Sequence, residues 1–89
     1  MNINKPRIVS LVTLTSTGEK VYFVTIADGL KAIHVRDHRA YAGSGTWSGI
    51  FVFNAKFFQM GPKITNVDPR MRSYQLAAEY LEKNPQKFR

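Results

Sequence analysis

The stretch that decides the fold is residues 7–36, RIVSLVTLTSTGEKVYFVTIADGLKAIHVR. Two of its segments, 7–15 and 20–27, are rich in β-branched and apolar residues, which favour extended backbone. Between them lies the turn-forming tetrapeptide STGE at 16–19, in which Gly18 can adopt the positive φ of a tight turn. The pattern therefore predicts a β-hairpin at the start of the domain.

A third strand is predicted at 30–36, because Asp28-Gly29 is a strong signal for a two-residue hairpin turn. Successive side chains of a strand point to opposite faces of the sheet. We expect one face of this strand to be packed and the other to be solvated. The packed pair is Ile33 with Val35, and the solvated pair is His34 with Arg36.

The middle of the chain is compatible with more than one arrangement of strands. Residues 37–46 are expected to form a loop, and 47–60 is the most aromatic part of the sequence. Within it 50–53 is strand-like, and 54–55 either turns the chain into another strand or lies in one long bent strand. After Gly-Pro breaks this region, 63–67 is expected to add a short final strand.

The last element is predicted to be a helix. Asp68 can cap it, and Pro69 suits the first helical position, where a missing N–H costs nothing. Asn84-Pro85 ends it, because the residue before a proline avoids helical angles. Its apolar stripe, at spacings of three and four, is formed by Met71, Tyr74, Ala78 and Leu81. The fold class is therefore α+β: an antiparallel sheet of four to five strands, hairpin first, with one C-terminal helix packed on one face.

Length and composition predict a single domain over 1–89, with 1–6 and 85–89 as flexible tails. Of the 89 residues 44% are hydrophobic, which is typical of a globular protein. The sequence has no cysteine, and no stretch of it approaches the roughly 18 apolar residues of a membrane span. We expect a cytoplasmic protein without a signal peptide and without contact to a membrane.

The charge balance points to an acidic partner. Thirteen Lys and Arg against six Asp and Glu give a net charge of +7, and such a field attracts phosphates or acidic protein surfaces. Proteins that bind single-stranded nucleic acids combine cations for the phosphates with aromatic side chains on which bases stack. Both kinds of residue occur together here, so we expect non-enzymatic, sequence-tolerant binding of DNA or RNA, single strands being favoured.

The candidate binding residues come from three parts of the chain. Basic side chains and a tyrosine lie in and just after the third predicted strand, a tryptophan and a lysine lie in the aromatic segment, and two arginines begin the helix. Those two oppose the helix dipole, a misfit that phosphate contacts would relieve. The full set is His34, Arg36, His38, Arg39, Tyr41, Trp47, Lys56, Arg70 and Arg72.

Catalysis and metal binding are not expected, and no cofactor is predicted. On a strand His34 and His38 would lie about 13 Å apart, too far to bind one metal ion. The serines lack the context of a nucleophile elbow, and Gly43-Ser44-Gly45 is too short for a phosphate loop. A small ribonuclease using His34 or His38 stays open as an alternative.

A second alternative is an inhibitor or adaptor, of the kind that small viral proteins often provide, which grips an acidic protein surface. An exposed edge strand could pair with a partner strand or with a second copy of this chain, giving a homodimer. Phe51, Phe53 and Phe57 could form an exposed aromatic face on which bases stack, but Phe51 and Phe53 are expected in the core. Phe88 in the basic tail is expected to be unpacked and to offer a docking point.

Overall fold

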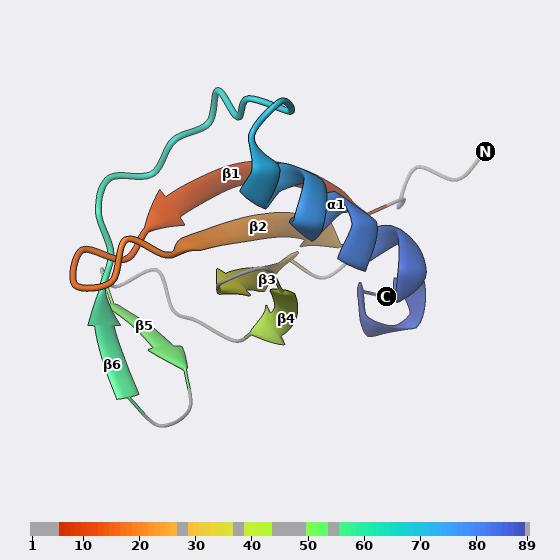
Figure 1. The fold of residues 1–89 in the computed structure, drawn as a ribbon. Helices are drawn as coiled ribbons and strands as arrows, with labels where there is room; N and C mark the ends of the chain where they lie inside the picture. Colours follow the sequence, from red (N-terminus) through yellow and green to blue (C-terminus); the bar gives the residue numbers. More distant parts are fainter. Residues whose placement is uncertain (1–5, 27–28, 37–38, 44–49, 54–55, 89) are drawn as a thin grey trace.

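The computed structural model shows an α+β fold with an antiparallel four-stranded sheet, which confirms the predicted fold class (Figure 1). The strand order is β1-β2-β3-β4, so each strand pairs with its neighbour in sequence. The strands of this sheet are β1 (Arg7–Thr13), β2 (Lys20–Ile26), β3 (Gly29–Arg36) and β4 (Arg39–Gly43). The residues that the structure describes are 6–26, 29–36, 39–43, 50–53 and 56–88.

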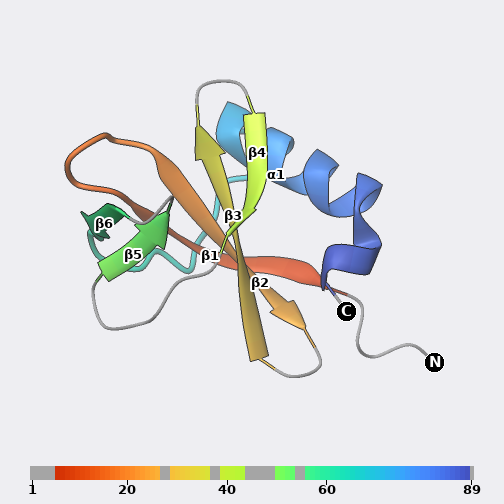
Figure 2. The same ribbon diagram turned by 90° about the horizontal axis from the view of Figure 1, so that it is seen from below.

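The remaining elements are a second sheet and two helices. The small sheet is an antiparallel hairpin, so the aromatic segment forms a hairpin and not one bent strand. In Figure 2 this hairpin lies to the left of strands β3 and β4, and helix α1 lies to their right. These elements are β5 (Ile50–Phe53), β6 (Lys56–Gln59), the helix α1 (Arg72–Lys83) and a 3₁₀ helix η1 (Pro85–Phe88).

The first hairpin forms as predicted. Gly18 has φ 75° in the turn, where a side chain would be strained, and Gly29 opens the β2–β3 pairing at φ 132°. The register of β1 against β2 shifts between Ile8 and Ser10, which marks a β-bulge. From Ser10 to Thr13 the pairing of β1 with β2 continues without a further shift.

Two expectations for the strands need correction. Residues 39–43 form β4, where the sequence predicted only a loop, because their backbone pairs with residues 32–36 along the free edge of β3. The predicted strand at 63–67 is reduced to a single bridge between Ile64 and Leu11. Around it, backbone hydrogen bonds of 2.8–2.9 Å join 59–64 to residues 11–15, so this segment covers the outer edge of β1 near its end.

The centre of the sheet is buried on both faces, and β2 contributes alternately to the two cores. On one face the helix-side core contains Leu11, Tyr22, Val24, Ile33, Val35, Ala77 and Phe88. On the other face the hairpin-side core contains Val12, Leu14, Val21, Phe23 and Ala32, against which Phe58 and Met60 pack. The four residues 21–24 are therefore all buried, unlike a strand with one wet face.

Helix α1 covers one face of the sheet, as predicted, but begins later than the sequence suggests (Figure 1). Its N-cap is Met71, without a side-chain cap, so the prediction that Asp68 caps it is wrong. Asp68 instead accepts a hydrogen bond of 2.9 Å from the Arg70 amide and closes a turn before the helix. Ala77, and not Ala78, is the fully buried helix residue, while the end at Asn84 is confirmed.

The C-terminal segment packs against the sheet and helix. Phe88 is 1% exposed and its ring meets Tyr80 edge-on at 6.1 Å between centroids. Lys31 Nζ donates to the Lys87 carbonyl oxygen at 2.8 Å, which ties this segment to β3. The expectation of an unpacked Phe88 is therefore wrong: a phenylalanine that can reach an unfilled part of the core gains more by burial than by solvation.

Candidate nucleic-acid interface

Four of the predicted binding residues lie together where β3 ends and β4 begins. The register pairs Arg36 with Arg39 and His34 with Tyr41. Since residues opposite each other on paired strands share a face, all four belong to the face that α1 does not cover. Arg36 and Arg39 are exposed and Tyr41 is 38% exposed. We call Arg36 and Arg39 the arginine pair.

Glu19 organises this corner of the sheet. The turn around Gly18 brings its carboxylate to the end of β3, where Oε2 lies 3.4 Å from Arg36 Nε and Oε1 lies 3.3 Å from His34 Nε2. The Arg36 side chain is still 54% exposed, whereas that of Glu19 is only 18% exposed. The carboxylate therefore orients Arg36 and offsets part of the repulsion within the arginine pair, while the guanidinium stays accessible to a ligand.

Glu19 was not singled out by the sequence, which offered only its position in a turn. A usable signal did exist, because extending the hairpin register by one pair beyond Lys20–Val35 brings Glu19 opposite Arg36. Charge pairing across strands could have been read from that register once the turn was placed.

His34 is completely buried, with 0% exposure, and the expectation that it is solvated is wrong. The reason is tertiary: Phe58 and Met60 pack on this face of the sheet, so inner positions on it are not open to water. Burial lowers the pKa of His34 below its ordinary value of 6.5, and the neighbouring Glu19 partly opposes that change. In this structure His34 contacts the Glu19 carboxylate that also contacts Arg36, and it does not reach the surface.

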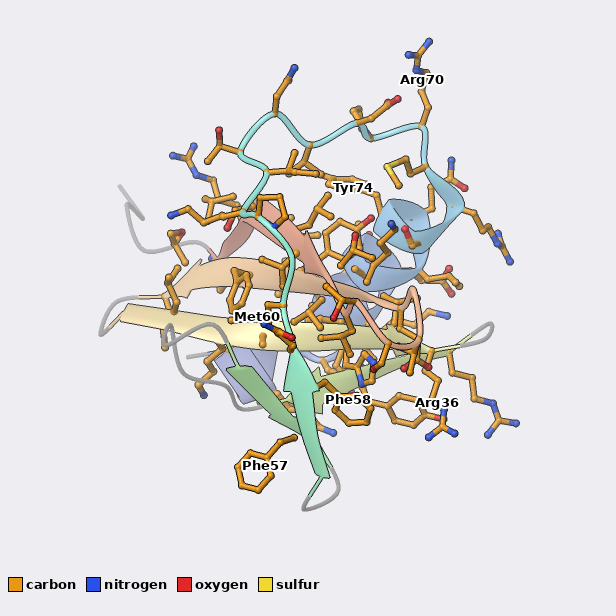
Figure 3. The ribbon with its side chains drawn as sticks, turned by 90° about the vertical axis from the view of Figure 1, so that its left-hand side faces the viewer. Arg36, Phe57, Phe58, Met60, Arg70 and Tyr74 are labelled. Atoms are coloured by element: carbon orange, nitrogen blue, oxygen red, sulfur yellow. The ribbon has the colours of Figure 1, made fainter. Side chains whose placement is uncertain are left out.

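Arg70 and Arg72 form a separate basic region at the other side of the molecule. Figure 3 shows Arg70 and Arg36 at opposite margins. The Arg70 guanidinium lies against the Asp68 carboxylate, with Nε 3.1 Å from Oδ1, and this contact lowers the pKa of Asp68. Arg72, the first residue of α1, is exposed. The structure thus does not join these arginines to the arginine pair.

Three predicted residues are not placed as side chains. His38 and Trp47 lie outside the described residues, and Lys56 is the first residue of β6. Their proposed roles stay predictions.

The structure adds an exposed aromatic residue that the sequence did not distinguish from core phenylalanines. Phe57 is 75% exposed, while Phe58 next to it is half-buried against the hairpin-side core. Alternation along β6 explains the difference, since adjacent side chains point to opposite faces. The two rings could not be told apart before the face of β6 that meets the sheet was known.

Other kinds of site are not found in the part of the chain that the structure describes. Within it, no group of three or more His, Cys, Asp or Glu side chains could hold a metal ion. Among the described helices, none is long and apolar enough to cross a membrane. Comparison with protein-family models, curated proteins and solved structures gives no significant match to this chain.

Proposed function

We propose that this chain is a small, basic, non-enzymatic nucleic-acid-binding protein that holds the phosphate backbone with the arginine pair. The observation that supports this proposal most is the register of Arg36 against Arg39, which places two exposed arginine side chains on the same face at one end of the sheet. Like charges directly opposite each other on paired strands are unfavourable. A phosphate between them would remove that repulsion and accept hydrogen bonds from both.

Tyr41 and the net charge support the same function. Tyr41 stands on the same face, two register pairs away from the arginine pair, with its ring partly exposed. The charge of +7 provides long-range attraction for any polyanion. Binding of this type does not depend on base edges, so we expect little sequence preference. The absence of cysteine in the sequence fits the reducing cytoplasm, which we propose as the compartment.

A fluorescence-polarisation titration with a labelled oligonucleotide tests the proposal. We expect binding at micromolar protein and low salt that weakens steeply as salt rises, because counterions are released from the phosphates. The double variant Arg36→Ala/Arg39→Ala should bind more weakly, and its plot of log affinity against log salt should be shallower by about 1.4 for a single strand. Trp47→Ala, in the predicted aromatic region, should also weaken binding.

The matched control is Arg7→Ala/Lys83→Ala, which removes the same charge from exposed positions on β1 and α1. It should retain most of the affinity. No polarisation change with wild-type protein at low salt would refute nucleic-acid binding. Equal loss in the control and in the arginine-pair variant would show that net charge alone, and not this corner of the sheet, attracts the ligand.

A second candidate function, an inhibitor or adaptor for an acidic protein, is favoured by the edge position of β4 in the four-stranded sheet. A partner strand or a second copy of this chain could add to this edge, with exposed Arg39 and Tyr41 beside it. This function predicts an acidic protein that stays bound in a pull-down after nuclease treatment. Retention of no partner under those conditions would count against it.

A ribonuclease activity is not favoured by the position of His34. A general base must reach the proton that it removes, and the imidazole of His34 is fully buried.

A further inference from the structure

The hairpin β5–β6 presents one strongly exposed aromatic ring. Phe57 is 75% exposed, more than any other large hydrophobic residue among those described; Leu30, Tyr41 and Ile64 are 38–44% exposed. Figure 3 shows the Phe57 side chain pointing away from the sheet, whereas Phe58 lies toward it. The hairpin is anchored by Phe58 and Met60, so it holds Phe57 outward on a fixed support.

The charge around Phe57 narrows the kind of partner. Figure 3 shows Arg36 and Phe57 both in the lower half of the molecule, with Phe58 between them, and Arg70 at the top. Both project from the side of the sheet that α1 leaves open, since the hairpin packs on that face and the arginine pair belongs to it. A partner that fits there needs negative charge for the arginines and a flat apolar face for the ring. Nucleobases attached to phosphates have both properties.

A duplex does not fit this combination equally well. Its bases are stacked inside the helix and offer only their edges in the grooves, so no base face is available to an aromatic side chain. A single strand has bases that can stack on phenylalanine while the backbone runs past the cations. On the basis of the function proposed above, we propose that Phe57 is a base-stacking residue and that the ligand of this face is single-stranded nucleic acid.

The test compares wild-type protein, Phe57→Ala and Phe57→Trp with a labelled single-stranded oligothymidylate and with a duplex of the same length. We expect wild-type protein to prefer the single strand. Phe57→Ala should weaken single-strand binding about 5- to 150-fold, the range for losing one stacked base, and should leave the salt dependence unchanged. Phe57→Trp should retain or improve binding, because indole stacks at least as well as phenyl.

The control is Ile64→Ala, which shortens another exposed apolar side chain that lies at the covered edge of β1. It should leave affinity unchanged. Because Phe57 is largely exposed, Phe57→Ala should also keep the wild-type melting temperature, so a loss of binding cannot be attributed to unfolding.

The outcomes separate this inference from the function on which it rests. If wild-type protein binds oligonucleotides and Phe57→Ala binds equally well, or if the duplex is bound as tightly as the single strand, stacking on Phe57 is refuted and nucleic-acid binding stands. If wild-type protein binds neither ligand, both are refuted. A wild-type dimer in light scattering that Phe57→Ala converts to a monomer, without single-strand preference, would assign the ring to self-association and overturn the inference.

Discussion

At the scale of single residues, burial decides what a polar side chain does. Tyr22 is fully buried, yet its hydroxyl lies 2.6 Å from Ser73 Oγ, so the polar end is satisfied inside the helix-side core. Burial nevertheless raises the pKa of Tyr22. At the end of the sheet the single carboxylate of Glu19 likewise contacts a buried side chain, His34, and at the same time the exposed side chain of Arg36. Polar side chains such as Tyr22 and His34 are therefore part of the packed interior, whereas the polar side chain of Arg36 remains accessible to a ligand.

His34 should make the stability of the protein depend on pH. Its pKa is below the ordinary value of 6.5 in the folded state because burial disfavours the charged form. As pH falls through 6.5, the unfolded chain takes up a proton that the folded chain does not, so the free energy of unfolding decreases. The decrease is at most about 1.4 kcal/mol per pH unit, and it ends below the folded-state pKa.

Thermal unfolding followed by circular dichroism checks this prediction. The melting temperature of wild-type protein should be lower at pH 5.5 than at pH 7.5, and His34→Gln should show a smaller difference. The variant Gln86→Ala, which changes no titratable group at an exposed position, serves as the control and should keep the wild-type difference. An unchanged pH dependence in His34→Gln would mean that another group is responsible.

At the scale of elements, short segments complete a sheet that the long strands begin. The 59–64 segment covers the edge of β1 with backbone hydrogen bonds. On the other side of the sheet, the Tyr80 hydroxyl accepts a hydrogen bond from the Ala42 amide at 3.3 Å and so connects α1 to β4. The C-terminal segment then fills the core beside Tyr80 through Phe88.

The 3₁₀ helix η1 should therefore contribute strongly to stability although it has only four residues. Phe88→Ala removes a ring that is 1% exposed, and such a change costs about 3–5 kcal/mol in the free energy of unfolding. Urea denaturation gives the value. The neighbouring variant Gln86→Ala, at an exposed position, should be nearly neutral. Similar midpoints for both variants would contradict the packed position of Phe88.

At the scale of the whole molecule, the two cores share one sheet. In β2, Tyr22 and Val24 belong to the helix-side core, while Val21 and Phe23 belong to the hairpin-side core. Neither core can lose its packing without disturbing the strand that contributes to the other. In a chain of 89 residues each core is too small to be stable alone.

We accordingly expect a single cooperative unfolding transition. Calorimetric and van't Hoff enthalpies should agree, and near- and far-ultraviolet circular dichroism should give the same midpoint. One variant in each core, Leu14→Ala and Phe88→Ala, should lower both midpoints together. Separate transitions, with one core melting first in its own variant, would show that the two faces are independent.

The sequence by itself determined the elements whose signals are local. β-branched residues, the Gly18 turn and the Gly29 hairpin were enough to predict β1, β2 and β3, and Asn84-Pro85 was enough to end the helix. These features depend on backbone preferences and on neighbours a few residues away, so they can be read along the chain. The candidate site was only partly predictable: the sequence indicated Arg36, Arg39 and Tyr41 as neighbours, and pairing along β3 and β4 brings them to one face.

Only the tertiary structure decided which side chains are covered. His34 and Arg36 are two residues apart on β3 and lie on the same face of the sheet. One is nevertheless buried and the other exposed, because Phe58 and Met60 cover only part of that face. Phe88 was assigned in the opposite sense to what is observed for the same reason. Burial depends on segments that are distant in sequence, and a two-residue period says which face a side chain is on but not what lies against that face.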